Sequence, residues 1–182
     1  MNIRLSSKEA IIEAAFHLFK ENPRASLAEI AKYAGVGRVT LHRHFSGRED
    51  LVIELGKIAL TEMDEIAEQA ASGASSYTDA LRLMMFALVP LADRQWFLTN
   101  QIFDGSSDIQ KESQRQLEEM KSVIDLAKKE GGLNSALPSP WICETFDALL
   151  YAAWEMVRTE QLTTLQASEL AWGTFMNGVG SE

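Results

Sequence analysis

Apolar residues recur at intervals of three and four along nearly the whole chain, and no run alternates apolar and polar residues over the length of a strand. This period predicts helices from end to end. In the first segment the apolar positions lie one helical turn apart: Ala10, Ile11, Ala14, Ala15, Leu18 and Phe19. Three pairs of Ser and Glu have the spacing of a capping box, which marks helix starts: Ser6 with Glu9, Ser26 with Glu29, and Ser46 with Glu49.

The rest of the chain continues the pattern in longer segments. A helix is expected from Arg48 to about Ala70, and the small polar segment 72–76 separates it from the next helix. Residues 77–92 are apolar nearly all round, which is typical of a buried helix, and Pro90 is expected to kink or end it. Further helices are expected at 109–130, from Pro140 behind a cap at Ser139, and between 165 and 179. The total is about nine helices.

Residues 26–45, SLAEIAKYAGVGRVTLHRHF, concentrate residue types that serve several chemistries. The glycines from Gly35 onward are spaced as in part of a dinucleotide-binding loop, but that loop follows a strand, and the preceding AEIAKYA has a helical pattern. His42 and His44 point about 200° apart on a helix, so one unbroken helix cannot place both on a metal. Two short helices joined by a tight glycine turn form a helix-turn-helix, and this is the interpretation we favour.

Each apolar position of this helix-turn-helix has a structural role. Ile30 and Ala31 face the second helix, and Gly35 supplies the turn. Three positions anchor the second helix to the first: Val36, Leu41 and Phe45. Steps of about 100° per residue from the inward Leu41 place four residues on the outer face: Val39, Thr40, His42 and Arg43. The alternative is a surface helix with incidental charge.

The outer face suits the major groove of DNA, because no acidic residue lies between Gly35 and Gly47. An arginine can hold a guanine edge with two hydrogen bonds, and Thr and Val can contact thymine methyl groups. Arg38 and Arg48, at the two ends of the region, are expected at phosphates. The full set of residues expected to contact DNA is Ser26, Gly37, Arg38, Val39, Thr40, His42, Arg43, His44 and Arg48.

The charge distribution fits this interpretation better than the net charge does. The 182 residues carry a formal net charge of −9, which by itself argues against a nucleic-acid partner. Residues 1–52, however, hold eight Lys and Arg against six Asp and Glu, and the rest of the chain holds nine against twenty. This split indicates a slightly basic head on an acidic body, with a chance distribution as the alternative.

Composition limits the class of protein. An apolar content of 46% is enough for a substantial core. The longest strongly apolar run, Leu83–Ala92, is about half the length that spans a bilayer, and the polar start MNIRLSSKEA is unlike a secretory signal. The single cysteine, Cys143, excludes an internal disulfide and a zinc site built from cysteines. The protein is therefore predicted to be cytoplasmic.

The segment KEAIIEAAFHLFKENPRASLAEIAKYAGVGRVTLHRHFSGREDLV resembles the N-terminal domain of the tetracycline-repressor (TetR) family of bacterial transcriptional regulators. The similarity rests on the first helix ending in LF, the SLAEIA helix start, the AGV turn, the TLHRHF recognition helix and the basic-acidic pair after it. The resemblance implies an all-α homodimer with a DNA-binding head and a C-terminal body that binds a small molecule. It also implies that the last two long helices form a four-helix bundle with those of the partner.

On this basis we expect a helix-turn-helix domain at 1–50, a connecting helix and seam at 51–76, and an effector-binding and dimerisation domain at 77–182. The expected function is a ligand-responsive regulator, a repressor released from a palindromic operator by a small-molecule effector. Two positions depart from the family pattern: His42 stands where many members have Tyr, and Gly37 where many have Ser or Thr. Operator specificity is therefore not carried over.

In the body, Met and aromatic residues are candidates for the wall of a ligand pocket, because they adapt to apolar guests. The candidate ligand contacts are Met84, Trp96, Phe103, Met120 and Phe146. The candidate dimer residues are Phe146, Ala153, Trp154, Trp172, Phe175 and Met176. For both sets the alternative is packing in the protein's own core.

The sequence offers less support for other classes of function. The motifs of metalloproteases, α/β-hydrolases and P-loop NTPases are absent, and all three histidines lie in the head. An enzyme is therefore not expected, and neither a metal nor a cofactor is predicted. The alternatives are a helical dimeric small-molecule-binding protein without DNA binding and, after it, an enzyme. The sequence does not identify the effector, the operator, or repression as opposed to activation.

Overall fold

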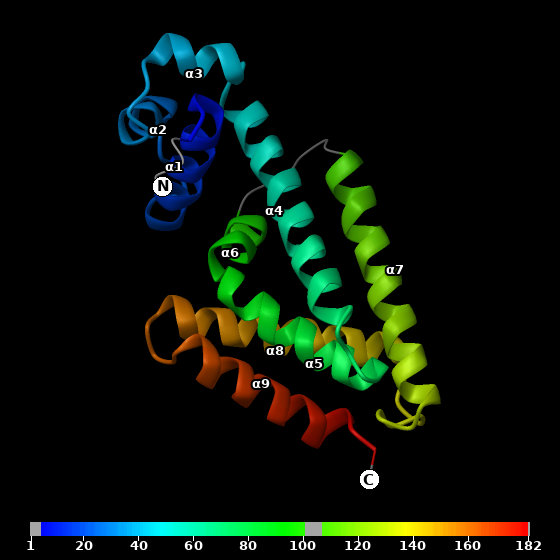
Figure 1. Ribbon diagram of the computed structural model, residues 1–182. Helices are drawn as coiled ribbons and strands as arrows, with labels where there is room; N and C mark the ends of the chain where they lie inside the picture. The colour runs from blue at the N-terminus through cyan, green and yellow to red at the C-terminus, as the bar shows by residue number, and fades with distance from the viewer. Residues whose placement is uncertain (1–4, 101–106, 182) are drawn as a thin grey trace.

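The computed structural model describes residues 5–100 and 107–181 of the chain (Figure 1). These residues are predominantly helical, and the only pairing of strand type within them is an isolated bridge between Leu133 and Gly180. The helices are α1 Ser7–Glu21, α2 Leu27–Tyr33, α3 Arg38–His44, α4 Arg48–Ala71, α5 Tyr77–Leu88, α6 Ala92–Asn100, α7 Ser107–Lys129, α8 Ser139–Arg158 and α9 Thr164–Val179, with the short 3-10 helix η1 Val89–Leu91 after α5. The all-α class is confirmed. In the two described ranges no helix is long and apolar enough to cross a bilayer.

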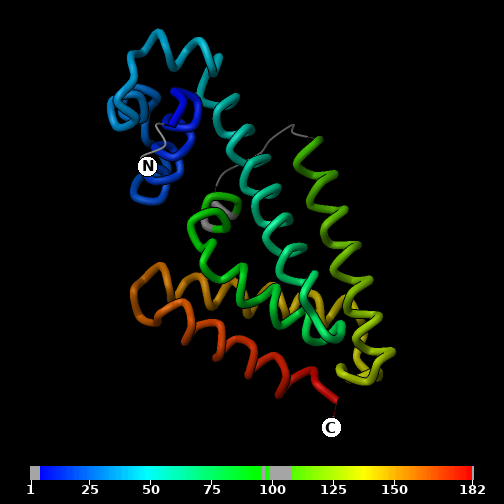
Figure 2. Tube along the Cα trace, in the orientation of Figure 1, coloured from blue at the N-terminus to red at the C-terminus, as the bar shows by residue number. Residues whose placement is uncertain are grey.

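The helices are arranged around the long α4 (Figure 1). Helices α1–α3, which we call the head, gather at one end of α4, and α5, α8 and α9 pack towards its other end (Figure 2). α7 runs beside α4, and α6 lies between the head and the rest (Figure 1). We call α5–α9 the body. Each part has its own apolar core, the head around Phe19 and Leu41 and the body around Phe146 and Phe175.

Two of the three predicted capping boxes are present. The side chains of Ser6 and Ser26 accept hydrogen bonds from the third residue of α1 and of α2, and the glutamates at those positions accept in return. The third box is wrong, because α4 begins one residue later, with Gly47 as its N-cap. The partner of Ser46 is consequently Asp50, whose carboxylate accepts from the Ser46 amide at 2.8 Å.

Prolines set two boundaries in the body. The predicted end of α5 near Pro90 is confirmed, since α5 stops at Leu88 and continues as η1. The predicted cap at Ser139 is wrong: Pro138 is the N-cap of α8, and Ser139 is already helical and buried. The Ser139 hydroxyl donates to the carboxylate of Asp125 on α7, so this residue joins two helices.

Candidate functional site

Helices α2 and α3 form the predicted helix-turn-helix. The turn passes through Gly35, whose φ of +68° lies in the left-handed region that favours glycine. Ile30 on α2 is fully buried, and Leu41 on α3 is 1% exposed. Phe45, directly after α3, is also buried in the head core. These apolar contacts hold α3 against α2 and leave one side of α3 free.

The free side of α3 carries most of the residues expected to contact DNA. Val39 is 84% exposed, although burial would stabilise an apolar side chain. Arg38, His42 and Arg43 are exposed as well, and Thr40 is half-buried beside them. A cleft of about 280 Å³ lies between the first turn of α2 and α3, with Arg38 and His42 among its lining residues. The structure thus brings Arg38, Val39, His42 and Arg43 to one solvent-facing surface.

Arg48 is not part of that surface. Its guanidinium donates hydrogen bonds to the backbone carbonyls of Ala25 and Pro23 and lies 4.6 Å from the ring centroid of Phe19. Two of its N–H donors are therefore used inside the head, and a phosphate contact through the remaining donors stays a prediction. Within the head, the arginine ties the loop before α2 to α1 and α4.

Two more of the residues expected to contact DNA, His44 and Ser26, differ from the exposed residues of α3. The Nε2 atom of His44 is buried and, among the described residues, has no hydrogen-bond partner. His44 therefore does not share the exposed face of α3. Ser26 is exposed, but its hydroxyl donates to Glu29 at 2.7 Å and accepts from the Glu29 amide, so it is already used in the cap of α2. Gly37 is the N-cap of α3, and a Cβ added there would have no atom within 4 Å.

Helix α6 connects the head with the body. Phe97 is fully buried in the head core and packs on Phe16 and Phe19 from α1. Arg94 reaches Glu62 on α4 at 2.7 Å and Glu13 on α1 at 3.2 Å, and its guanidinium lies 3.9 Å from the Phe16 ring centroid. The sequence pattern gave no sign that a body helix completes the core of the head.

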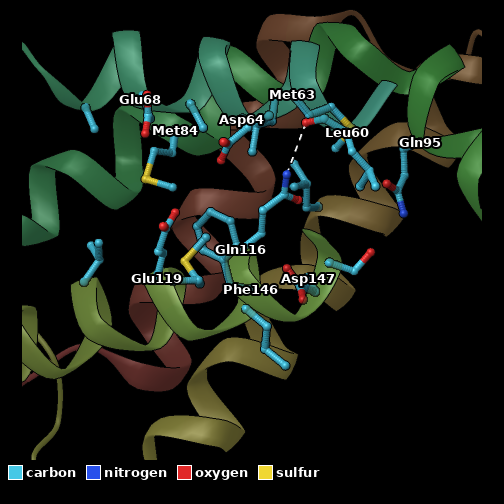
Figure 3. A pocket seen from close by; sticks show the side chains of 18 of the residues that line it. Leu60, Met63, Asp64, Glu68, Met84, Gln95, Gln116, Glu119, Phe146 and Asp147 are labelled. Carbon is cyan, nitrogen blue, oxygen red and sulfur yellow. Dashed lines mark hydrogen bonds between the residues drawn. The ribbon is translucent and has the colours of Figure 1, made fainter. Parts of the chain in front are cut away.

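A pocket of about 470 Å³ lies between α4 and the body helices (Figure 3). Its lining residues are Leu60, Met63, Asp64, Ala67, Glu68 and Ala71 from α4, Met84 and Leu88 from α5, Gln95 and Leu98 from α6, Ser113, Gln116, Leu117, Glu119, Met120 and Val123 from α7, and Phe146, Asp147, Leu150 and Trp154 from α8. Three predicted ligand contacts, Met84, Met120 and Phe146, are among them. The side chain of Trp96 and the whole of Phe103 lie outside the described residues.

The α4 wall of the pocket was missed at the sequence level. The pocket was expected within 77–182, whereas α4 supplies several of its lining residues. The apolar positions of α4 continue at helical spacing from Leu60 through Met63 to Ala67, beyond the length that the head needs. This continued apolar pattern was the sign in the sequence that α4 also packs against the body.

The carboxylates of the pocket differ in their partners. Arg115 on α7 is hydrogen-bonded to Glu112, Asp64 and Glu119, and these bonds raise the pKa of the guanidinium. Asp147 on α8 has no such cation among the described residues. Burial among the surrounding protein, together with repulsion from Glu144, raises the pKa of Asp147 to about 6. The residue itself is exposed at the wall of the pocket, so solvent reaches it even though the protein around it raises its pKa.

Most of the predicted dimer residues lie in the body core instead. Phe146 and Phe175 are fully buried and meet edge to face, and Trp154 donates from Nε1 to the carbonyl of Leu88 at 2.8 Å. Ala153 is buried as well, so these four residues offer little surface to a partner in the single chain, and their dimer role stays a prediction. Trp172 and Met176 are partly buried. The large apolar side chains that α8 and α9 expose are Trp141, Tyr151, Leu165 and Leu170.

Comparison with known proteins gives a match in the head. The family described as "Bacterial regulatory proteins, tetR family" matches residues 11–55, which include α2, the turn and α3. The HTH-type transcriptional repressor LfrR of Mycolicibacterium smegmatis is 35% identical over 77 residues, which are 42% of this chain and 40% of LfrR. The HTH-type transcriptional regulator NfxB of Pseudomonas aeruginosa is 23% identical over 97% of this chain and 96% of its own length.

Solved structures extend the likeness of fold to the body. The structure of LfrR from Mycobacterium smegmatis in complex with proflavine has a TM-score of 0.80 at 23% identity and covers 94% of this chain and 95% of its own. The structure of AibR in complex with isovaleryl coenzyme A and operator DNA also has a TM-score of 0.80, at 15% identity, and covers 93% of this chain and 97% of its own.

Proposed function

The chain belongs to the tetR family of bacterial regulatory proteins, and from this premise we propose that it is a dimeric transcriptional repressor released from its operator by a small-molecule effector. The single observation that carries the proposal is the exposed face of α3, where Arg38, Val39, His42 and Arg43 share one surface without an acidic neighbour on that helix. Arginine and small side chains on such a face match the donor and acceptor pattern of the major groove.

The pocket supports the effector part of the proposal. A cavity of about 470 Å³ with mainly apolar walls has the size and character of a small-molecule site. LfrR and AibR, two proteins of the same fold, were solved with small organic molecules, and AibR also with operator DNA. A regulator with an effector site in the body is therefore a better fit than a DNA-binding protein without a ligand.

The proposed route from the pocket to the head runs through α6 and α4. Leu98 lines the pocket and also packs against the head core, one position from the buried Phe97. α4 lines the pocket with its second half and contributes Leu51 and Leu55 to the head core with its first half. A guest that moves either helix thus moves the head, and only a guest with unequal affinity for two head positions changes DNA binding.

Dimerisation would supply two heads for two half-sites. The outward faces of α8 and α9 hold the exposed apolar residues Trp141, Tyr151, Leu165 and Leu170, and large exposed apolar surfaces mark interaction sites. We place the dimer interface there. A two-fold axis would then give a roughly palindromic operator with half-sites about 34–36 Å, or a multiple of that, apart.

The proposal is tested by selecting bound duplexes from a random DNA library with the purified full-length protein. The expected result is one enriched sequence with two inverted half-sites, bound in a mobility-shift assay more tightly than a scrambled duplex. A pool with no enrichment would contradict DNA recognition and favour the helical small-molecule-binding protein. Compounds that raise the melting temperature are then titrated with and without the operator, and a regulator requires a difference of about 5- to 150-fold between the two affinities.

A further inference from the structure

The charged residues that line the pocket are all acidic. Four of its lining residues are acidic, Asp64, Glu68, Glu119 and Asp147, and within the described part of the chain no Lys, Arg or His lines it. Arg115 is not among the lining residues, but it forms ion pairs with two of these carboxylates, Asp64 and Glu119. The distance from the Arg115 guanidinium to the Glu119 carboxylate is 2.6 Å. α5 and α6 contribute only uncharged lining residues. The charge that is left facing the cavity comes from Asp147 on α8 and from the exposed Glu68 on α4.

Asp147 is the carboxylate that an occupant of the pocket would meet. Among the described residues it accepts no hydrogen bond and forms no ion pair, and the nearest charged influence, Glu144 one turn earlier on α8, is repulsive. Most of the other residues that line the cavity are apolar, among them Phe146 and Trp154 on the same helix. Figure 3 shows Asp147 in this lining, together with the polar side chains of Gln95 and Gln116. An unpaired anion at the wall of a mainly apolar cavity is stabilised when a cation binds beside it.

We propose that the effector is an organic cation with an apolar body, held with its positive charge against Asp147 and its body among the Met and aromatic side chains of the pocket. This inference rests on the proposed effector function and names the ligand class for that same site. The cavity supplies the apolar contact area, and the carboxylate selects the charge. A neutral guest would leave Asp147 unpaired in a drier site, and an anionic guest would add repulsion from both Asp147 and Glu68.

The test uses two acridines that differ in charge more than in shape. The purified full-length protein is titrated at mildly alkaline pH with 10-methylacridinium, which is permanently cationic, and with acridine, which is uncharged there, and binding is followed by ligand fluorescence and calorimetry. The proteins compared are the wild type, Asp147→Asn, and Glu65→Gln as the control, because Glu65 is an exposed carboxylate on α4 outside the pocket lining.

The wild type and Glu65→Gln are expected to bind the cation roughly tenfold to a hundredfold more tightly than acridine. Asp147→Asn is expected to lose this preference through weaker binding of the cation, while acridine binds as before. If acridine binds and Asp147→Asn changes neither ligand, the charge selection is overturned and the effector pocket stands. Binding of neither compound by the wild type overturns the inference, and selection of operator DNA from the random library then decides the proposed function independently.

Discussion

Arg43 and Arg48 lie five positions apart and have opposite surroundings. Arg43 projects from the outer face of α3 into solvent. Arg48 is half-buried against the carbonyls of Pro23 and Ala25 and the ring of Phe19. An arginine is therefore proposed to serve recognition at the first position, whereas at the second it stabilises the fold of the head.

Arg43→Ala is expected to cost about 1–3 kcal/mol of binding free energy on the selected operator and to relax the base preference at one position of each half-site. The measurement is fluorescence anisotropy with the operator and its single-base variants. Arg38→Ala is the comparison: as a phosphate contact it should weaken all sequences alike and reduce the salt slope by about one. Unchanged affinity and preference in Arg43→Ala would mean that the wrong face of α3 has been assigned.

Arg48→Met is expected to destabilise the head, because two backbone carbonyls lose a charged donor and the cation–π contact with Phe19 is lost. A loss of about 2 kcal/mol in the free energy of unfolding corresponds to a melting temperature lower by about 5 °C. Thermal unfolding followed by circular dichroism measures it, with Arg24→Met, an exposed arginine of the same loop, as the control. A normal melting temperature combined with weaker DNA binding would instead support the predicted phosphate contact of Arg48.

Asp147→Asn is expected to raise the melting temperature more at alkaline than at acidic pH. The pKa of Asp147 is about 6 in the folded protein, above its ordinary value, so the folded state holds the proton more tightly than the unfolded state does. Stability from this group is therefore lost as the pH rises through the window between about 4 and 6, and the loss persists above it. The difference between variant and wild type, measured in the absence of ligand at both ends of the window, isolates this group. An equal difference at both ends would show that burial does not hold the proton there.

At the scale of the element, α8 shows why a helix cannot be divided into faces from composition alone. It carries large apolar side chains on its inward side, among them Phe146 and Trp154, and others on its outward side, among them Trp141 and Tyr151. The bulky residues that we expected at the dimer interface are the ones that fill the core. The outward residues of α8, with those of α9, are the surface left for a partner.

Leu170→Glu on α9 is expected to convert the dimer into monomers, because it places a charge in the proposed interface at a residue that is 61% exposed in the single chain. Analytical ultracentrifugation should then give the 20.2 kDa mass of one chain in place of twice that mass. Tyr33→Glu, another exposed apolar residue but on the head, is the control and should remain dimeric. A monomeric wild type at micromolar concentration would remove the dimer from the proposal.

In the whole molecule, the head and the body are joined by direct packing and not only through the chain that connects them. Phe97 from α6 lies in the head core, and Arg94 from the same helix joins α1 and α4. Lys20 on α1 and Asp93 on α6 add an ion pair at 2.9 Å. The pocket and the head are consequently two ends of one packed unit around α6.

Arg94→Met is expected to reduce the coupling between effector and operator while leaving each binding event in place. Methionine retains much of the apolar stem but lacks the donors that reach Glu13 and Glu62. By linkage, operator and effector weaken each other by the same factor, about 5- to 150-fold, and the variant should bring this factor several-fold closer to one. Arg82→Met, whose ion pair with Asp79 stays within α5, is the control. The same factor in wild type and variant would exclude Arg94 from the route.

Three features could be predicted from the order of residues alone: the all-α class, the two capping boxes at Ser6 and Ser26, and the helix-turn-helix with its outward Val39 and Arg43. These features depend on interactions within about one helical turn, such as apolar period, caps and a glycine turn, and such interactions can be read along the chain. Four features appear only once the helices are packed together: the hydrogen bonds of Arg48 within the head, the insertion of Phe97 into the head core, the α4 wall of the pocket, and Asp147 without a cation beside it. Each of these depends on which distant segments pack together, and an apolar or charged residue of a given type looks the same in sequence whether its partner is solvent, its own core or a cavity.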